Sequence, residues 1–349
     1  MKKMLALLLA LVMVLSLAAC ASSQPATTDA AASTETAETT EAAEPAAEEP
    51  AEAPAESGKT YTVGVCQLVQ HEALDAATQG FIDALKEELG DAVTVDVQNA
   101  SGDSVNCGTI VNGFVSKGVD LIMANATPAL TAAVSATADI PILGTSITAY
   151  GVALDIDDFN GTVGGNVSGT SDLADLQAQA QMILDWFPET KTVGLLFCSA
   201  EPNSRYQIDE VRKALEAQGV TCEEFAFTDS NDVSSVTQKA ADFSDVVYIP
   251  TDNTAASNTE AIANVLIPAG VPAICGEEGL CRGCGVATLS ISYYDLGVTT
   301  GKMAAKILKG EADISTMPVE YTDATPKYNA SVCEQLGITP LDGYEAIDG

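Results

Sequence analysis

The residues best suited to binding a small molecule stand in short polar segments that directly follow short apolar stretches. They combine amides, hydroxyls, carboxylates and the single histidine of the chain, and they occupy residues 67–71, 125–128, 145–146, 199–204, 251–254, 277–278 and 292–295. Hydroxyls and the free N–H groups at helix starts suit a carboxylate. Nearby acids suit an ammonium. The pattern therefore favours a site for a small charged solute such as an amino acid.

The expected ligand contacts are Gln67, His71, Thr127, Ser146, Ser171, Asn203, Ser204, Asp252, Asn253, Glu278 and Tyr293. A bound amino acid is expected to place its carboxylate near Thr127, Ser146 and Ser204. Its ammonium is expected near Asp252 or Glu278. Candidate rings for stacking on an aromatic ligand are Tyr150, Phe159, Tyr206, Tyr293 and Tyr294. An aliphatic ligand would use Leu68 and Ile147 instead.

Several of these residues also have a purely structural interpretation. Thr127, Ser171 and Ser204 can be helix N-caps, because Ser and Thr favour that position in any helix. Asp252 and Asn253 can form an Asx-turn. His71 can be a solvated loop residue, since a lone histidine has no second imidazole with which to hold a metal. These alternatives stay open from the sequence.

Enzymatic chemistry has little support in the chain. A nucleophile elbow G-x-S-x-G, a P-loop lysine motif and a G-x-G-x-x-G opening the first helix are all missing from the sequence. We therefore expect no catalytic residue and no cofactor. A hydrolase that uses a carboxylate pair such as Glu277 and Glu278 remains the enzymatic alternative.

The cysteines point to buried thiols more than to metal binding. Besides Cys20 the chain has eight cysteines, and Cys66, Cys198 and Cys275 stand in apolar stretches where small thiols are commonly buried. Cys281 and Cys284 form a single C-x-x-C, whereas a zinc site needs further ligands at suitable spacing. We expect free or locally bonded thiols and no metal.

The elements that must position the polar segments alternate between strands and helices. Apolar stretches rich in β-branched residues predict strands at 61–67, 93–97, 121–125, 140–144, 192–198, 223–227, 246–249, 273–276 and 286–291. Helical spacing runs between them, for example from Leu74 to Leu89 and from Tyr294 to Gly310. The fold class is therefore α/β with parallel sheets.

A run of turn-forming residues at 161–169 interrupts this alternation and divides it into two sets. We expect two lobes: the first from residues 59–168 and 292–321, the second from residues 169–291 and 322–349. The helix that ends at Gly310 is expected to return to the first lobe. Ligands of such sheets bind beyond the carboxyl ends of the strands, where the polar segments stand.

The composition describes an acidic folded protein. The chain has 349 residues, of which 47% are hydrophobic, and 15 Lys+Arg stand against 49 Asp+Glu for a formal charge of −34. That length allows about two domains at roughly 100–200 residues each. The negative charge would repel phosphate backbones, so nucleic acid is not expected as a partner.

The N-terminal region has the features of an export signal. Lys2 and Lys3 precede an apolar run at 4–17, which is shorter than the ~20 residues of a membrane-spanning helix. Residues 17–20, Leu-Ala-Ala-Cys, resemble the lipobox of bacterial lipoproteins, which implies lipidation at Cys20 after removal of a signal peptide at 1–20. Residues 21–58 are acidic, with alanine as their only apolar type, and are expected to form a disordered tether. A plain signal peptide is the alternative.

Five segments in one order carry a family resemblance. Residues 63–77 (VGVCQLVQHEALDAA), 125–129 (NATPA), 201–204 (EPNS), 250–254 (PTDNT) and 292–297 (SYYDLG) resemble substrate-binding proteins of ABC transporters of the TrpX type. The resemblance extends from Lys59 to about Leu336. It implies a type I periplasmic-binding-protein fold, with two Rossmann-like lobes hinged by three crossovers. Where relatives often carry Asp-Pro, this chain has Ala149 and Tyr150.

The resemblance also implies a function. We expect a lipid-anchored protein on the extracytoplasmic face of the bacterial cell membrane that captures a small molecule between its lobes. The implied ligand is an aromatic amino acid (Trp, Phe or Tyr), delivered to an ABC transporter permease by a monomeric, non-enzymatic protein. The alternatives are an aliphatic amino acid or another small solute, and a sensor that presents its ligand to a membrane receptor.

Overall fold

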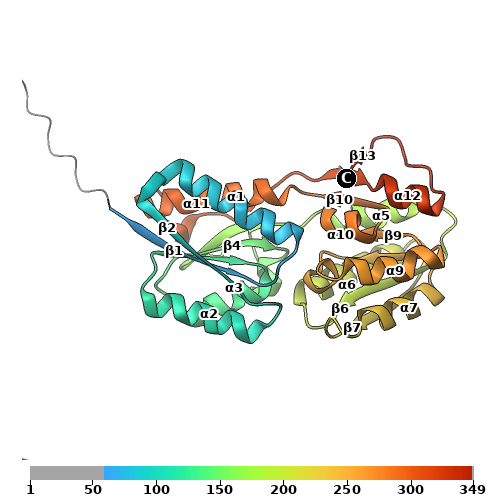
Figure 1. The fold of residues 1–349 in the computed structure, drawn as a ribbon, viewed down its shortest axis with the longest axis horizontal. Helices are drawn as coiled ribbons and strands as arrows, with labels where there is room; N and C mark the ends of the chain where they lie inside the picture. The colour runs from blue at the N-terminus through green and yellow to red at the C-terminus, as the bar shows by residue number, and fades with distance from the viewer. Residues whose placement is uncertain (1–58, 348–349) are drawn as a thin grey trace, which may run out of the picture. The chain divides into compact units, whose positions relative to one another are not determined.

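The computed structural model describes residues 59–347, which fall within one compact unit, Glu56–Gly349 (Figure 1). The expected signal peptide at 1–20, the lipidation site Cys20 and the expected tether at 21–58 lie outside the described residues. Among residues 59–347, no helix combines the length and apolar character needed to cross a membrane.

The first lobe is built on a sheet of parallel strands. Across the sheet the order is β11 (Glu320–Tyr321), β5 (Val167–Ser171), β4 (Ile142–Ile147), β3 (Leu121–Asn125), β1 (Tyr61–Gln67) and β2 (Val93–Asn99). Helices α1 (Glu72–Leu89) and α11 (Tyr293–Lys309) cover one face, and α2 (Ser104–Lys117) and α3 (Thr127–Ala136) cover the other (Figure 1). Coverage on both faces explains why the central strands are continuously apolar.

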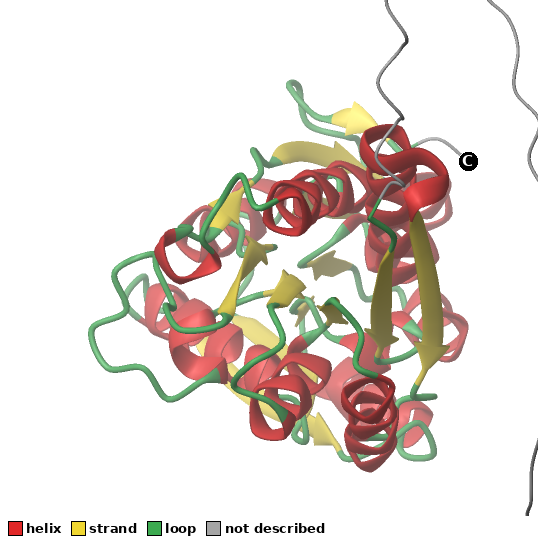
Figure 2. Ribbon diagram, turned by 90° about the vertical axis from the view of Figure 1, so that its left-hand side faces the viewer, coloured by secondary structure: helices red, strands yellow, loops and turns green. Residues whose placement is uncertain are grey.

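The second lobe repeats this architecture. Its strand order is β13 (Glu345–Ala346), β12 (Thr325–Tyr328), β10 (Ala287–Ser290), β9 (Ala273–Cys275), β8 (Val246–Ile249), β6 (Thr192–Cys198) and β7 (Thr221–Phe227), with only β10 and β12 antiparallel among the described pairs. Helices α5 (Leu176–Trp186), α6 (Pro202–Glu216) and α12 (Ala330–Leu336) pack on one side, and α7 (Val233–Phe243), α9 (Thr259–Ala269) and α10 (Glu278–Cys284) on the other. Figure 2, seen from the first lobe, shows strands between layers of helices.

Short helical segments complete the described chain: α4 (Tyr150–Ala153), α8 (Asn253–Ala256), and the 3₁₀ turns Gly90–Ala92 and Ile314–Thr316. The two lobes of mainly parallel strands confirm the expected α/β fold class. The C-terminal strand pair β12 and β13 was not predicted, because Thr325–Tyr328 contains a proline and lacks an apolar pattern.

Helix α11 begins in the polar segment at 292–295 and packs on the first lobe, as predicted. The Ser292 hydroxyl accepts a hydrogen bond from the Asp295 N–H group at its start, and Gly310 ends it in the left-handed conformation with φ 74°. A Cβ built on Gly297 would lie 2.0 Å from the Ala77 carbonyl oxygen of α1. The two helix backbones are therefore in direct contact.

The chain crosses between the sheets three times: after β5, after β10 and after β11. The first crossing follows Ser171 and not Ser168, because β5 pairs with β4 through Ser168 and Gly169 and places Thr170 and Ser171 beside β11. The run at 161–169 is thus partly a strand and not only a turn. Strand β5 as a whole, Val167–Ser171, has one apolar residue and a glycine, which is depleted in strands, yet all five of its residues are buried.

Candidate functional site

A small cavity lies between the two lobes, at the carboxyl ends of their strands. It contains about 270 Å³ of space between atoms, part of which is open to solvent. Its walls are His71, Leu74, Ser146, Thr148, Asp172, Asn203, Thr251, Asp252, Asn253, Ala256, Glu277 and Tyr293. This edge of an open parallel sheet is where ligands bind.

Part of the predicted contact set comes together here. The predicted residues in the cavity wall are His71, Ser146, Asn203, Asp252, Asn253 and Tyr293. The wall also contains four polar residues that were not predicted as contacts, although each of them follows the carboxyl end of a strand: Thr148, Asp172, Thr251 and Glu277.

Asp172 is the acid of the cavity wall with an unused oxygen. It directly follows β5, is only 5% exposed, and its Oδ2 accepts a 2.8 Å hydrogen bond from the Tyr293 hydroxyl. Its other oxygen, Oδ1, is buried and has no hydrogen-bond partner among residues 59–347. Burial raises the pKa of Asp172, while the Tyr293 hydrogen bond and the nearby Thr148 hydroxyl oppose the rise. A buried carboxylate with a free oxygen is suited to an ammonium group.

Two residues near this wall have backbone conformations that L-residues rarely adopt. Ser146 has φ 56° and Ala126 has φ 89°. The pairing of β4 with β5 shifts register between Gly144 and Ile147, so Ser146 stands at the irregularity. Such conformations cost of order 1–3 kcal/mol each and cluster at binding sites. The Ser146 hydroxyl is buried and has no partner in the described part of the chain, which leaves it available to a ligand carboxylate.

The wall contributed by the second lobe is organised by Glu201. Its carboxylate accepts hydrogen bonds from the backbone N–H groups and side chains of Asn253 and Thr254, over distances of 2.7–3.0 Å. It also accepts a 3.3 Å bond from the Asn203 amide. Glu201 is 4% exposed. This buried acid is therefore saturated by protein donors, and it fixes the two asparagines that line the cavity.

His71 closes the cavity from the first lobe. It stands just before α1, and its Nε2 lies 3.2 Å from Oδ1 of Asn253 in the second lobe. Its Nδ1 is buried without a partner. Burial lowers the pKa of His71, and the hydrogen bond to Asn253 and the charges of Glu201 and Asp75 oppose the decrease. The imidazole is therefore a neutral contact between the lobes at neutral pH.

The other two acids of the wall are used by the protein itself. Asp252 accepts hydrogen bonds from the N–H groups of Ala255 and Cys198, at 2.8 and 2.7 Å. Glu277 caps α10 by accepting from the N–H groups of Gly279 and Leu280. Burial raises the pKa of Asp252 to about 7, with a further rise from the charge of Glu201, and burial raises the pKa of Glu277 to about 7. Asp252, expected to hold the ammonium, thus has both oxygens occupied.

Three predicted contacts of the first lobe lie outside the cavity wall. The Gln67 side chain donates to Asp75 at 2.6 Å and accepts from Thr78 at 2.6 Å, so it braces α1. Ser171 donates to the Thr148 carbonyl at 3.0 Å. Thr127 is the first residue of α3 and is buried, with an unpartnered hydroxyl that does not line the cavity.

The remaining two predicted contacts belong to the second lobe. Ser204 is fully buried in α6 and donates to the Asp252 carboxylate, so it supports the wall from behind. Glu278 pairs with Arg282 at 2.8 Å and Lys327 at 2.5 Å, away from the cavity. Neighbouring Glu277 faces the cavity instead, because the start of α10 turns the two side chains in different directions.

Most of the rings predicted to stack on an aromatic ligand lie outside the cavity wall. Tyr150 is fully buried in the first lobe, donates to the Thr170 carbonyl at 3.2 Å and stacks on Phe159 at 6.3 Å. Tyr294 is 42% exposed and bonds to Asp83. Tyr206 packs against the core of the second lobe. Of the candidate rings, Tyr293 lines the cavity, and the apolar part of the wall comes from Leu74 and Ala256.

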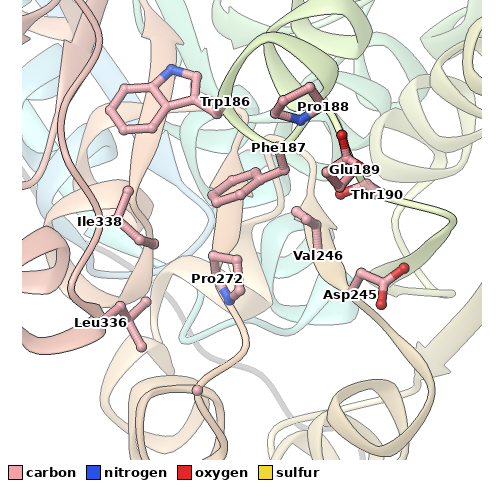
Figure 3. Close-up of a pocket in the computed structure, with 11 residues that line it drawn as sticks. Trp186, Phe187, Pro188, Glu189, Thr190, Asp245, Val246, Pro272, Leu336 and Ile338 are labelled. Carbon is pink, nitrogen blue, oxygen red and sulfur yellow. The ribbon is translucent and has the colours of Figure 1, made fainter.

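A second hollow, of about 840 Å³, lies at the other end of the second lobe. Figure 3 shows the side chains of Trp186, Phe187, Pro272 and Ile338 around it. It adjoins the amino ends of β8 and β9, opposite to the edge where ligands of parallel sheets bind. Its acids Glu189 and Asp245 are both exposed, and Asp245 already accepts from the N–H groups of Lys191 and Thr192. It lacks the buried free charges that a zwitterion needs.

The described cysteines are thiols without disulfide bonds. Seven of the eight are buried, and Cys222 is half-buried. Burial raises the pKa of Cys198 and of Cys222 to about 11, which keeps both protonated. Within residues 59–347, no cluster of His, Cys, Asp and Glu suitable for a metal ion is found.

Comparison with known proteins identifies relatives along most of the chain. Residues 62–343 match the family described as ABC transporter substrate binding protein. The tyrosine-binding protein of Clostridioides difficile strain R20291 is 33% identical over 276 residues, which is 77% of this chain and 79% of that protein.

Two solved structures with 32% identity superpose to different extents. The ABC domain from Streptococcus pneumonia in complex with L-Trp has a TM-score of 0.78 and is matched over 83% of this chain and 100% of its own. The ligand-free, open structure of a substrate binding protein with adhesive properties from Clostridium difficile has a TM-score of 0.64, over 83% and 99%. The fold of this chain is therefore more similar to the L-Trp complex than to the ligand-free, open structure.

Proposed function

The chain belongs to the family of ABC transporter substrate binding proteins, and we propose that it binds an aromatic amino acid in the cavity between its two lobes. Family membership implies a small-molecule ligand, an ABC transporter permease as partner, an extracytoplasmic location and a non-enzymatic role. The proposal adds the ligand class. The names of two relatives support it, since one is a tyrosine-binding protein and the other is a complex with L-Trp.

The observation that carries the proposal is the buried Asp172 carboxylate with its free Oδ1, in a cavity closed by both lobes. An α-amino acid supplies the ammonium that this oxygen lacks. The Ser146 hydroxyl, which is buried without a partner among residues 59–347, supplies a donor for the carboxylate. Asp172 and Tyr293 both stand directly beside crossings between the lobes, so a ligand held there would stabilise the closed arrangement.

Isothermal titration calorimetry with a panel of amino acids tests the ligand class. Binding of L-Tyr, L-Trp or L-Phe, and at least about tenfold weaker binding of L-Leu, L-Ile and L-Val, is the expected result. Mass spectrometry of small molecules released from the purified protein provides an independent identification. A preference for the aliphatic set would contradict the aromatic assignment, and binding of no amino acid would contradict the proposal as a whole.

Affinity for the amino acid is expected to fall as the pH is lowered from about 7 towards about 5. Burial raises the pKa of Asp172 in the empty cavity, so below that pKa a proton must leave before the ammonium can bind. Burial also lowers the pKa of His71 from 6.5 in the closed form, so closure is favoured above that pH and lost below it. The two effects have the same sign, and together they must exceed the opposite effect of Asp252 and Glu277, which take up protons in the closed form because burial raises the pKa of each to about 7. Calorimetry in two buffers of different ionisation enthalpy checks this, and a constant affinity over the range would contradict it.

Lipid anchoring is a further part of the proposal. Its support is the sequence of residues 1–20, with Lys2 and Lys3 before an apolar run that ends at Cys20. The acidic residues 21–58 would then connect the anchor to the lobes. The mass of the mature N-terminal peptide tests this: an unmodified Cys20 in the exported protein would contradict the lipid anchor.

A further inference from the structure

The part of the cavity wall formed by His71 and the second lobe contains hydrogen-bond acceptors that receive no hydrogen bond from the described residues. Oδ1 of Asn203 and Nδ1 of His71 are both buried and both lack a partner among the described residues. Asn203 is 4% exposed. Each residue lines the cavity. An unpaired buried acceptor is costly, so a ligand that supplies a donor at this wall would gain from it.

The orientation of the Asn203 amide follows from its surroundings. Its nitrogen, Nδ2, donates to the Thr251 carbonyl at 3.1 Å and to the Glu201 carboxylate at 3.3 Å. Rotating the amide by 180° would place its oxygen against these two acceptors. The carbonyl oxygen of Asn203 therefore faces the cavity, and it can only accept.

The tautomer of His71 follows in the same way, through Asn253. The Asn253 amide nitrogen donates to the Glu201 carboxylate at 2.7 Å, which leaves its oxygen to face His71. That oxygen lies 3.2 Å from Nε2 of His71, so Nε2 must carry the proton. In the neutral imidazole Nδ1 is then an acceptor. One buried carboxylate, Glu201, thus fixes both acceptors.

We propose that His71 and Asn203 select a ligand whose side chain carries a hydrogen-bond donor, and that Glu201 positions them for this role. The inference rests on the proposed function and narrows it: among aromatic amino acids, a phenol O–H or an indole N–H satisfies this wall and the phenyl ring of phenylalanine does not. The charged ammonium is assigned to Asp172, because a carboxylate pairs with it more strongly than neutral acceptors do. A site built to hydrogen-bond a substrate rejects an analogue without that group.

Calorimetry with L-Tyr, L-Trp and L-Phe tests the proposal on the full chain and on two variants, Asn203→Leu and His71→Phe. The natural protein is expected to bind L-Tyr or L-Trp at least about tenfold more tightly than L-Phe. Asn203→Leu is expected to lose most of that preference while its affinity for L-Phe changes by less than about threefold. His71→Phe is expected to lose the preference as well, in addition to an equal loss for all three ligands, because it also removes the contact with Asn253 between the lobes. Comparing the affinities for L-Tyr and L-Trp shows whether the phenol O–H or the indole N–H is the better donor for this wall.

Glu201→Gln tests the positioning role with the same readout. The amide that it introduces presents N–H donors to Asn253 and Thr254, so the two asparagines lose their fixed orientation. The preference of the Glu201→Gln variant for a donor-carrying ligand is expected to fall. The melting temperature of the same variant is measured as well, to compare its stability with that of the natural protein. The matched control is Glu260→Gln, an exposed acid of the same lobe, which should keep the preference of the natural protein.

Equal tightness for L-Phe and the donor-carrying ligands in the natural protein would overturn the proposal. An equal loss for all three ligands in Asn203→Leu and His71→Phe would also overturn it, because these atoms would then hold a group that every amino acid has. A natural protein that binds none of the three would instead contradict the proposed aromatic ligand. The two failures are therefore distinguishable.

Discussion

Replacing Asp172 with asparagine is expected to weaken amino acid binding at least about 100-fold, or ~2.7 kcal/mol. The substitution keeps the size of the side chain and an oxygen that can accept from Tyr293, but it removes the charge that the ligand ammonium would meet. Leaving one member of a buried ion pair unpaired costs about 3–5 kcal/mol. Calorimetry with the preferred amino acid measures the loss.

The control for this substitution is Asp185→Asn, which removes the same charge from an exposed position of the second lobe. Its affinity should equal that of the natural protein. Because burial of the Asp172 carboxylate is itself unfavourable, Asp172→Asn should melt no lower than the natural protein. A normal affinity in the Asp172→Asn variant would remove this residue from the ammonium site.

Replacing Gly297 with alanine is expected to lower the free energy of unfolding by about 3 kcal/mol, at the upper end of the cost of overpacking. The new Cβ would lie 2.0 Å from the Ala77 carbonyl oxygen, and a backbone atom cannot move aside as a side chain can. Helices α1 and α11 would have to separate. Because α11 starts at Tyr293, which donates to Asp172, the same change should also weaken binding.

A matched glycine is available for comparison in α2. A Cβ on Gly113 would have no heavy atom within 4 Å, so alanine there should raise stability by about 0.5–1 kcal/mol through its better helix propensity. Thermal melting of the two variants should therefore shift in opposite directions. A Gly297→Ala variant that melts at or above the temperature of the natural protein would contradict the close packing of α1 on α11.

Local patterns in the sequence were sufficient for the fold class. Strands β1, β3, β6 and β8 have the predicted bounds, because each is a continuous apolar run that is covered on both faces. The start of α11 was predicted to within one residue from its apolar spacing. Strand β5 was missed, since its burial comes from the neighbouring strands β4 and β11 and not from its own composition.

The sequence also predicted ligand contacts at the carboxyl ends of the strands, and the predicted residues that line the cavity are His71, Ser146, Asn203, Asp252, Asn253 and Tyr293. The prediction named Glu278, whereas Glu277 lines the cavity. A sequence pattern cannot distinguish two adjacent acids at the start of a helix, although their side chains point in different directions. The prediction did not include Asp172 at all. A lone aspartate after an unrecognised strand carries no local signal.

Only the tertiary structure shows which polar atoms already have a hydrogen-bond partner within the protein. Asp252 has its oxygens filled by Cys198, 54 residues earlier, and by its own helix. Glu201 is saturated by residues 52 and 53 positions away, and Tyr293 reaches back 121 residues to occupy one oxygen of Asp172. The types of residue at the strand ends are a property of the sequence. The atoms left free for a ligand depend on contacts between distant segments, because a buried group that finds a protein partner no longer needs one from the ligand.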